Sequence, residues 1–175
     1  MALEVGAASA LWSSFTAKAE LLGAAVMRTA SEDTAVELLR ETAREFACTT
    51  SVARRFPRLA EHAIRATARA TDMPATEVVG AGEFAVAETG SVAVDEARGD
   101  RGMCFLAERL WLLVPESEMV PNLDAAMLRM RELVQHGSPH PLLMSGPSRT
   151  ADIERTLTVG VHGPRALVVV VVGSG

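Results

Sequence analysis

The sequence predicts an α/β domain with a mostly parallel sheet flanked by helices, and three observations lead to that prediction. The 175-residue chain fits a single domain over 1–175, and its hydrophobic content of 49% is ample for a core. Aromatic residues make up only 4%, so the core relies on aliphatic side chains that suit helices packed onto a sheet. Apolar runs with strand character alternate with helical patterns, as in βαβ units.

The first half of the chain follows this alternation. The expected elements are a helix over 11–22, a strand over 24–27, a helix over 32–46, a weak strand within 47–53 and a helix over 57–70. Gly23 is suited to end the first helix, and Ser31 to cap the second. Pro57 fits the first turn of the third helix, because its missing N–H has no partner there in any case.

The second half begins with strands. The expected elements are a strand-rich stretch over 77–95, an exposed charged turn over 96–101, a strand over 110–114, a helix over 123–134, a strand over 141–144, a helix over 150–158, a loop over 160–164 and a strand over 167–172. The continuous apolar run over 110–114 predicts a strand buried on both faces. Met127 and Met130 are expected in the core, because they share the apolar face of their helix.

Composition excludes several classes of protein. The net charge of −5 argues against a nucleic-acid binder, which would neutralise phosphates. No basic region followed by an apolar block stands at the start, so we expect a cytoplasmic protein. The longest apolar run, Ala166–Val172, is too short to span a membrane. Cys48 and Cys104 are expected to be buried, reduced thiols, and two cysteines are too few for an iron–sulfur cluster.

Arginine and histidine residues suggest an anion-binding site and a zinc site, and each pattern has a simpler explanation. Four of them recur at helical spacing: Arg58, His62, Arg65 and Arg69. They could bind an anion, but charged residues normally occupy the solvated face of such a helix, which we prefer. His136 and His140 are four residues apart, yet the Gly-Ser-Pro between them rules out a shared helix. We therefore expect no zinc site.

The first candidate site is the stretch Ser145–Glu154, where the residues predict a strand, a Gly-Pro turn and a helix N-terminus. Thr150 would cap that helix, so that free N–H groups face the end of the strand and could hold a phosphate or carboxylate. The residues expected to bind are Ser145, Gly146, Ser148, Arg149 and Thr150. A capping motif without a ligand explains the same residues, because acidic side chains already complement the helix dipole.

Two shorter loops are the other candidates. Glu88 stands between an apolar strand and a Thr-Gly turn, where Gly90 permits a positive φ. If partly buried, Glu88 could act as an acid or base; otherwise it is a solvated residue of a hairpin turn. His162 is flanked by Gly and Pro residues, and could bind a ligand, carry a proton or cap a strand.

Three motifs, Ala87–Ser91, Ser145–Glu154 and Gly160–Pro164, occur in an order and spacing that resemble the LUD domain, the family of lactate-utilisation protein C. The resemblance covers about residues 75–172. It implies a fold similar to the ribose-phosphate isomerase and CoA-transferase group. It also implies an association with bacterial oxidation of L-lactate to pyruvate, alongside partners that carry iron–sulfur clusters.

Under this resemblance, the leading hypothesis is a cytoplasmic accessory or ligand-binding component of lactate oxidation that holds no cofactor itself. Its motif loops would bind a small anionic metabolite through Thr89, Gly90, Ser91, Ser145, Gly146, Ser148, Arg149, Thr150, His162 and Gly163, beside Glu88. The alternative is an isomerase- or acyl-transfer-type enzyme with Glu88 as acid/base or nucleophile. In a third hypothesis, the loops bind another subunit.

Overall fold

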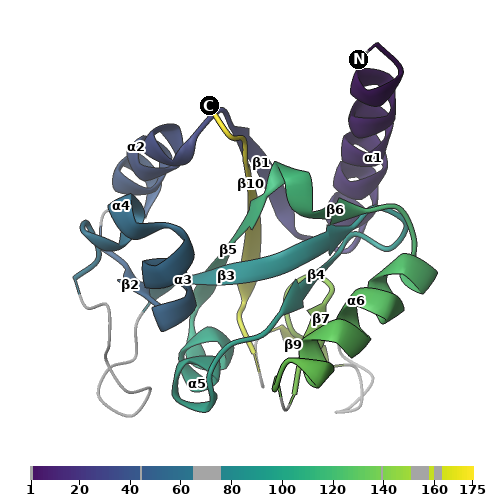
Figure 1. The fold of residues 1–175 in the computed structure, drawn as a ribbon. Coiled ribbons are helices and arrows are strands. Elements are labelled where there is room, and N and C mark those ends of the chain that lie inside the picture. Colours follow the sequence, from purple (N-terminus) through teal and green to yellow (C-terminus); the bar gives the residue numbers. More distant parts are fainter. Residues whose placement is uncertain (1, 44, 65–75, 139, 151–157, 160–162) are drawn as a thin grey trace.

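The computed structural model describes residues 2–43, 45–64, 76–138, 140–150, 158–159 and 163–175, arranged as helices around a twisted sheet (Figure 1). The helices are α1 (Ala2–Leu21), α2 (Glu32–Thr42), α3 (Thr50–Arg55), α4 (Pro57–Ala60), α5 (Arg98–Leu106) and α6 (Leu123–Gln135), with a 3₁₀ turn at Glu116–Glu118. The strands are β1 (Ala25–Thr29), β2 (Ala47–Cys48), β3 (Glu77–Val86), β4 (Ser91–Val94), β5 (Arg109–Pro115), β6 (Met119–Val120), β7 (Leu142–Met144), β8 (Arg149–Thr150), β9 (Thr158–Val159) and β10 (Ala166–Val172).

The main sheet has the order β1-β10-β5-β3-β4-β7, with β2 and β6 also paired to β3. Every pair from β1 through β10 and β5 to β3 is parallel, as are the pairs of β2 and β6 with β3. The β3–β4 and β4–β7 pairs are antiparallel, so β4 runs opposite to its two neighbours. The predicted α/β fold with a mostly parallel sheet is confirmed.

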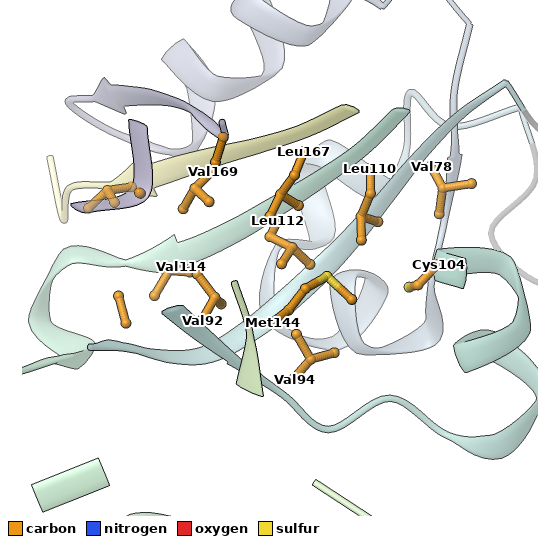
Figure 2. Close-up of a cluster of buried hydrophobic side chains, with 14 of the residues drawn as sticks. Val78, Val92, Val94, Cys104, Leu110, Leu112, Val114, Met144, Leu167 and Val169 are labelled. Carbon is orange, nitrogen blue, oxygen red and sulfur yellow. The ribbon is translucent and has the colours of Figure 1, made fainter. Parts of the chain in front are cut away.

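The central strands bury both faces, because alternate side chains point to opposite sides of a strand. In β5, Leu110, Leu112 and Val114 join a cluster with α1 and α5, which Figure 2 shows in close-up. Trp111 and Leu113 join the cluster on the other face, under α2, α3 and α4. The strand predicted over 110–114 is therefore confirmed, and it is buried on both sides.

Local signals at the helix ends also hold. Gly23 follows α1 with a φ of +86°, and the Ser31 side chain accepts a hydrogen bond from the backbone N–H of Thr34 at the start of α2. Cys48 and Cys104 are free and buried. Burial raises the pKa of the Cys48 thiol to about 11 and also raises that of Cys104, so neither is a ready nucleophile.

The helix predicted over 57–70 is wrong in length. Pro57 begins α4, but α4 ends at Ala60, and the N–H of Ile64 then bonds the Phe46 carbonyl at 3.0 Å. That bond joins Ile64 to the residue just before β2, so its N–H does not take part in a continued helix.

The predicted stripe of cations is consequently not a helix face in the described residues. Arg58 pairs with Asp33 at 2.6 Å, while His62 lies beyond the end of α4. Two further members of the stripe lie outside the described residues: Arg65 and Arg69.

The exposed turn predicted over 96–101 is wrong. Arg98 begins α5, and Glu96 and Asp100 are only 2% and 7% exposed. The physical reason is that hydroxyl and backbone donors around the start of α3 bind both carboxylates. Charge alone could not reveal those donors, because they lie some forty-five to fifty residues earlier in the chain.

The helix predicted over 123–134 is confirmed as α6, but its apolar face is only partly covered. Ala126 is buried, and Met130 packs against a small cluster that includes Phe84. Met127 and Val134, in contrast, are 46% and 53% exposed. The expectation that Met127 lies in the core is wrong.

Candidate functional site

Two of the predicted motif segments meet at one end of the β4–β7 pair. Ser91 begins β4 and Ser145 directly follows β7, and antiparallel pairing brings these positions to the same end. Their Oγ atoms lie 2.6 Å apart, so one hydroxyl donates to the other. Ser91 is buried and Ser145 is exposed, which places one member of the pair within reach of solvent.

The third motif segment joins the second. The backbone N–H of Ser148 donates to the Pro164 carbonyl at 2.9 Å. A Cβ on Gly163 would lie only 2.9 Å from the Ser148 Cβ, so glycine permits this close approach. We call this region, with Ser91, Ser145, Ser148 and Gly163, the motif end.

Two motif glycines pack against the C-terminal end of α1. Gly90 and Gly146 have φ values of +66° and +77°, a region that favours glycine. A Cβ on Gly90 would lie 2.4 Å from the Ala19 nitrogen, and one on Gly146 would lie 2.6 Å from the Leu22 oxygen. Both positions therefore require glycine for the fold, whether or not a ligand binds nearby.

Glu88 has a structural partner. Its exposed carboxylate accepts a hydrogen bond from the backbone N–H of Leu123, the first residue of α6, at 2.8 Å. An acidic group at this position complements the helix dipole. Its neighbour Thr89 has a buried hydroxyl oxygen without a hydrogen-bond partner among the described residues.

The helix predicted after the Gly-Pro turn is wrong at both of its ends. Arg149 and Thr150 form β8, which pairs antiparallel with Thr158 and Val159 of β9. Thr150 therefore does not cap a helix, and the proposed anion site at a helix N-terminus loses its basis. Residues 151–157 and 160–162, which include Asp152, Glu154 and His162, lie outside the described residues.

A second polar region, which the sequence analysis missed, lies at the opposite end of the β4–β7 pair. Glu96 Oε1 accepts hydrogen bonds from Thr49 Oγ1 at 2.7 Å and from the Ala81 N–H at 3.0 Å. Its Oε2 accepts one from Ser51 Oγ at 2.6 Å. Burial raises the pKa of this carboxyl, and the nearby charge of Asp100 adds to the rise, while the three hydrogen bonds oppose it.

Glu96 lies in the wall of a cavity of about 800 Å³, which we call the Glu96 cavity. Its walls include Ser51, Arg54, Glu96, Arg101, Ser138 and His140. The volume falls within the range of small-molecule sites. One sequence signal could have indicated this cavity: polar residues directly follow two strands, Thr49 after β2 and Asp95 after β4.

Among the described residues, no group of three or more His, Cys, Asp or Glu side chains is placed to hold a metal ion. The same part of the chain contains no helix with the length and apolar character needed to cross a bilayer.

The part of the chain that contains the three motif segments matches a known protein family. The model of the LUD domain matches residues 50–172, which include all three motifs and both ends of the β4–β7 pair. The chain belongs to the LUD domain family. Helix α1, which contacts the motif glycines, lies outside the matched residues of this LUD domain.

Curated relatives of this LUD domain are named lactate utilization protein C. The one from Geobacillus thermodenitrificans (strain NG80-2) is 36% identical over 95 residues, which are 51% of this chain and 39% of that protein. The one from Bacillus subtilis (strain 168) is 35% identical over 86 residues, 47% of this chain and 36% of that protein. The chain thus spans less than half the length of these relatives.

A solved structure resembles the chain over almost its full length. A crystal structure of a DUF162 family protein from Deinococcus radiodurans matches with a TM-score of 0.69 and covers 95% of this chain and 98% of that chain. At 21% sequence identity, this likeness shows the fold and does not extend to function.

Proposed function

We propose that this chain acts in lactate utilization, as an accessory or ligand-binding component of the oxidation of L-lactate to pyruvate. Membership of the LUD domain family and the names of the curated relatives support this assignment. Because the chain spans only part of those relatives, the assignment concerns this domain and not their whole activity.

The observation that carries the proposal is the meeting of three separate motif segments at the motif end. Ser91 Oγ contacts Ser145 Oγ at 2.6 Å, and the Ser148 N–H bonds the Pro164 carbonyl at 2.9 Å. Loops that converge at strand ends are where α/β proteins commonly bind ligands. We assign the exposed Ser145 hydroxyl to the contact with a small anionic metabolite or with a partner loop.

The proposal includes iron–sulfur partner proteins. Oxidation of lactate to pyruvate releases two electrons and two protons, so the system needs an electron acceptor. The two cysteines of this chain are both buried and are fewer than the four thiolates that such a cluster usually requires. The acceptor clusters would then lie on partners.

Glu88 receives no catalytic step in this proposal. Its exposed carboxylate accepts a hydrogen bond from the first N–H of α6, as the side chain of a helix cap does. The role of Glu88 as acid/base stays a prediction, and no contact among the described residues favours the enzyme alternative over the accessory role.

Growth on L-lactate as the sole carbon source tests the proposal in the organism that carries the gene. We expect a deletion strain to lose growth on lactate and keep growth on glucose, and the wild-type gene to restore growth. Ser145→Ala should restore it poorly, while the matched change Ser117→Ala, at an exposed serine in the 3₁₀ turn, should restore it fully. Unimpaired growth of the deletion strain on lactate would overturn the assignment.

A further inference from the structure

The Glu96 cavity brings together side chains from four separate segments of the chain. Ser51 and Arg54 come from α3, Glu96 follows β4, Arg101 belongs to α5, and Ser138 follows α6. None of these residues belongs to the three family motifs. A cavity of about 800 Å³ with convergent charged and hydroxyl groups has the character of a ligand site rather than of a packing gap.

The two arginines supply positive charge that no carboxylate pairs with in the described part of the chain. Among the described residues, the ion pairs involve other arginines, and neither Arg54 nor Arg101 has a carboxylate partner. Arg101 is held in place, because its Nη2 donates to the carbonyls of Glu96 and His140 at 3.4 and 3.2 Å. Its Nε is a buried donor with no acceptor in the described part of the chain, a feature that calls for an explanation.

Two aspartates at or near the cavity accept hydrogen bonds from the protein. Asp95, in the cavity wall, accepts one from the Ser138 hydroxyl, and Asp100, close to Glu96, accepts from the backbone N–H and the hydroxyl of Thr50. Both carboxylates are thus engaged with donors of the protein, and an ionised carboxylate has no proton to donate to an oxyanion. The arginines are the charged donors of the cavity that can bind one.

Glu96 adds a directional acceptor. A carboxylate has about four lone-pair positions, and the three donors of the protein occupy two on Oε1 and one on Oε2. One position on Oε2 is left, beside the Ser51 hydroxyl. A ligand hydroxyl could donate to it, whereas a ligand carbonyl could not bond it in the ionised state.

We propose that the Glu96 cavity binds a small hydroxylated metabolite with an oxyanion group, whose anion contacts Arg54 and Arg101 and whose hydroxyl donates to Glu96. The oxyanion is a carboxylate or a phosphate, since guanidinium groups bind both. This site is separate from the motif end, and it does not depend on the proposed role in lactate utilization.

Calorimetric titration of the purified full chain tests the site with four probes: L-lactate, pyruvate, sn-glycerol 3-phosphate and inorganic phosphate, each at constant ionic strength. Heat from a hydroxy acid assigns the carboxylate, and heat from glycerol phosphate assigns the phosphate. We expect a hydroxylated probe to bind with higher affinity than the probe that lacks the hydroxyl. L-lactate is compared with pyruvate in this way, and sn-glycerol 3-phosphate with inorganic phosphate. Saturable binding of none of the four would overturn the site.

Variants locate the binding within the cavity. Arg54→Gln should lower the affinity for the probe by about tenfold or more, because it removes a charged hydrogen-bond donor. The matched control is Arg40→Gln, at an exposed arginine on α2 that should leave binding unchanged. Glu96→Gln should reduce the preference for the hydroxylated probe over its partner while far-UV circular dichroism stays native. Binding that is equal in wild type and Arg54→Gln would contradict the proposed contact, whatever the growth of the deletion strain on lactate.

Discussion

The two ends of the β4–β7 pair differ in what their residues do. At the motif end, neutral hydroxyls contact each other, and glycines let α1 approach closely. At the other end, roughly 13 Å along β4 at about 3.3 Å per residue, charged side chains surround a cavity. The described motif glycines thus have packing roles, while charged side chains gather at the end where no motif is present.

The largest expected effect is on stability, and it compares one glycine at each end of the β4–β7 pair. Gly90→Ala places a Cβ 2.4 Å from the backbone of Ala19 at a φ of +66°, so helix α1 has to move. We expect a loss of about 3 kcal/mol or more in the free energy of unfolding, measured by urea denaturation.

Gly137→Ala is the matched control for this change. Gly137 lines the Glu96 cavity with a φ of +97°, but a Cβ there would meet nothing within 4 Å. Only the backbone cost remains, about 1 kcal/mol. Equal losses for the two variants would contradict the close packing of α1 at the motif end.

The next effect compares the two glutamates. Glu96→Ala leaves the Ala81 N–H and the hydroxyls of Thr49 and Ser51 without their buried acceptor. We expect a loss of about 2 to 3 kcal/mol in the free energy of unfolding.

Glu88→Ala should lower the same quantity by about 0.5 to 1 kcal/mol, because it removes one exposed helix cap. Urea denaturation of both variants in one buffer gives the comparison. A larger loss for Glu88→Ala than for Glu96→Ala would reverse the relation that we infer between the two regions.

The smallest effect is a difference in pH dependence. Burial raises the pKa of Glu96 above its ordinary value of 4.5, so the folded protein holds this proton more tightly than the unfolded chain. Between the two pKa values, a rise in pH therefore lowers the stability of the wild type. Above the folded pKa, the loss is complete and stays constant.

The amide side chain of Glu96→Gln cannot titrate. The unfolding free energy of this variant should therefore rise relative to that of the wild type as pH increases above about 4.5, until the folded-state pKa of Glu96 is passed. Ser145→Ala, at the motif end, should show the same pH profile as the wild type. Parallel profiles for Glu96→Gln and the wild type in urea denaturation would show that this carboxyl has an ordinary pKa.

The sheet could be predicted from the sequence because its central strands carry their own signal. The runs at Leu110–Val114 and Leu167–Val172 are continuous, apolar and β-branched or leucine-rich, and both are strands buried on two faces. Ser31 and Pro57 likewise mark helix starts through local chemistry. The contact between the motif segments was expected from the resemblance, and Ser91 and Ser145 do meet.

The Glu96 cavity could not be predicted in the same way. Glu96 stands in a charged stretch that has the composition of a solvated turn, and its donors come from Thr49 and Ser51, far away in the sequence. The pairing of β8 with β9 could not be predicted for a different reason, since Thr150 is an equally good helix cap or strand residue. Distant donors decided the first outcome, and a nearby strand partner decided the second.

The packing of α1 has a consequence for the order in which the chain can fold. Its C-terminal end contacts Gly90, which ends the turn between β3 and β4, and Gly146, which follows β7. During synthesis α1 emerges before the other described elements, yet its contact surface is incomplete until the chain beyond β7 has emerged. Helix α1 is therefore made before the elements that it packs against and is among the last to dock, and its apolar residues Phe15 and Ala19 stay uncovered until then.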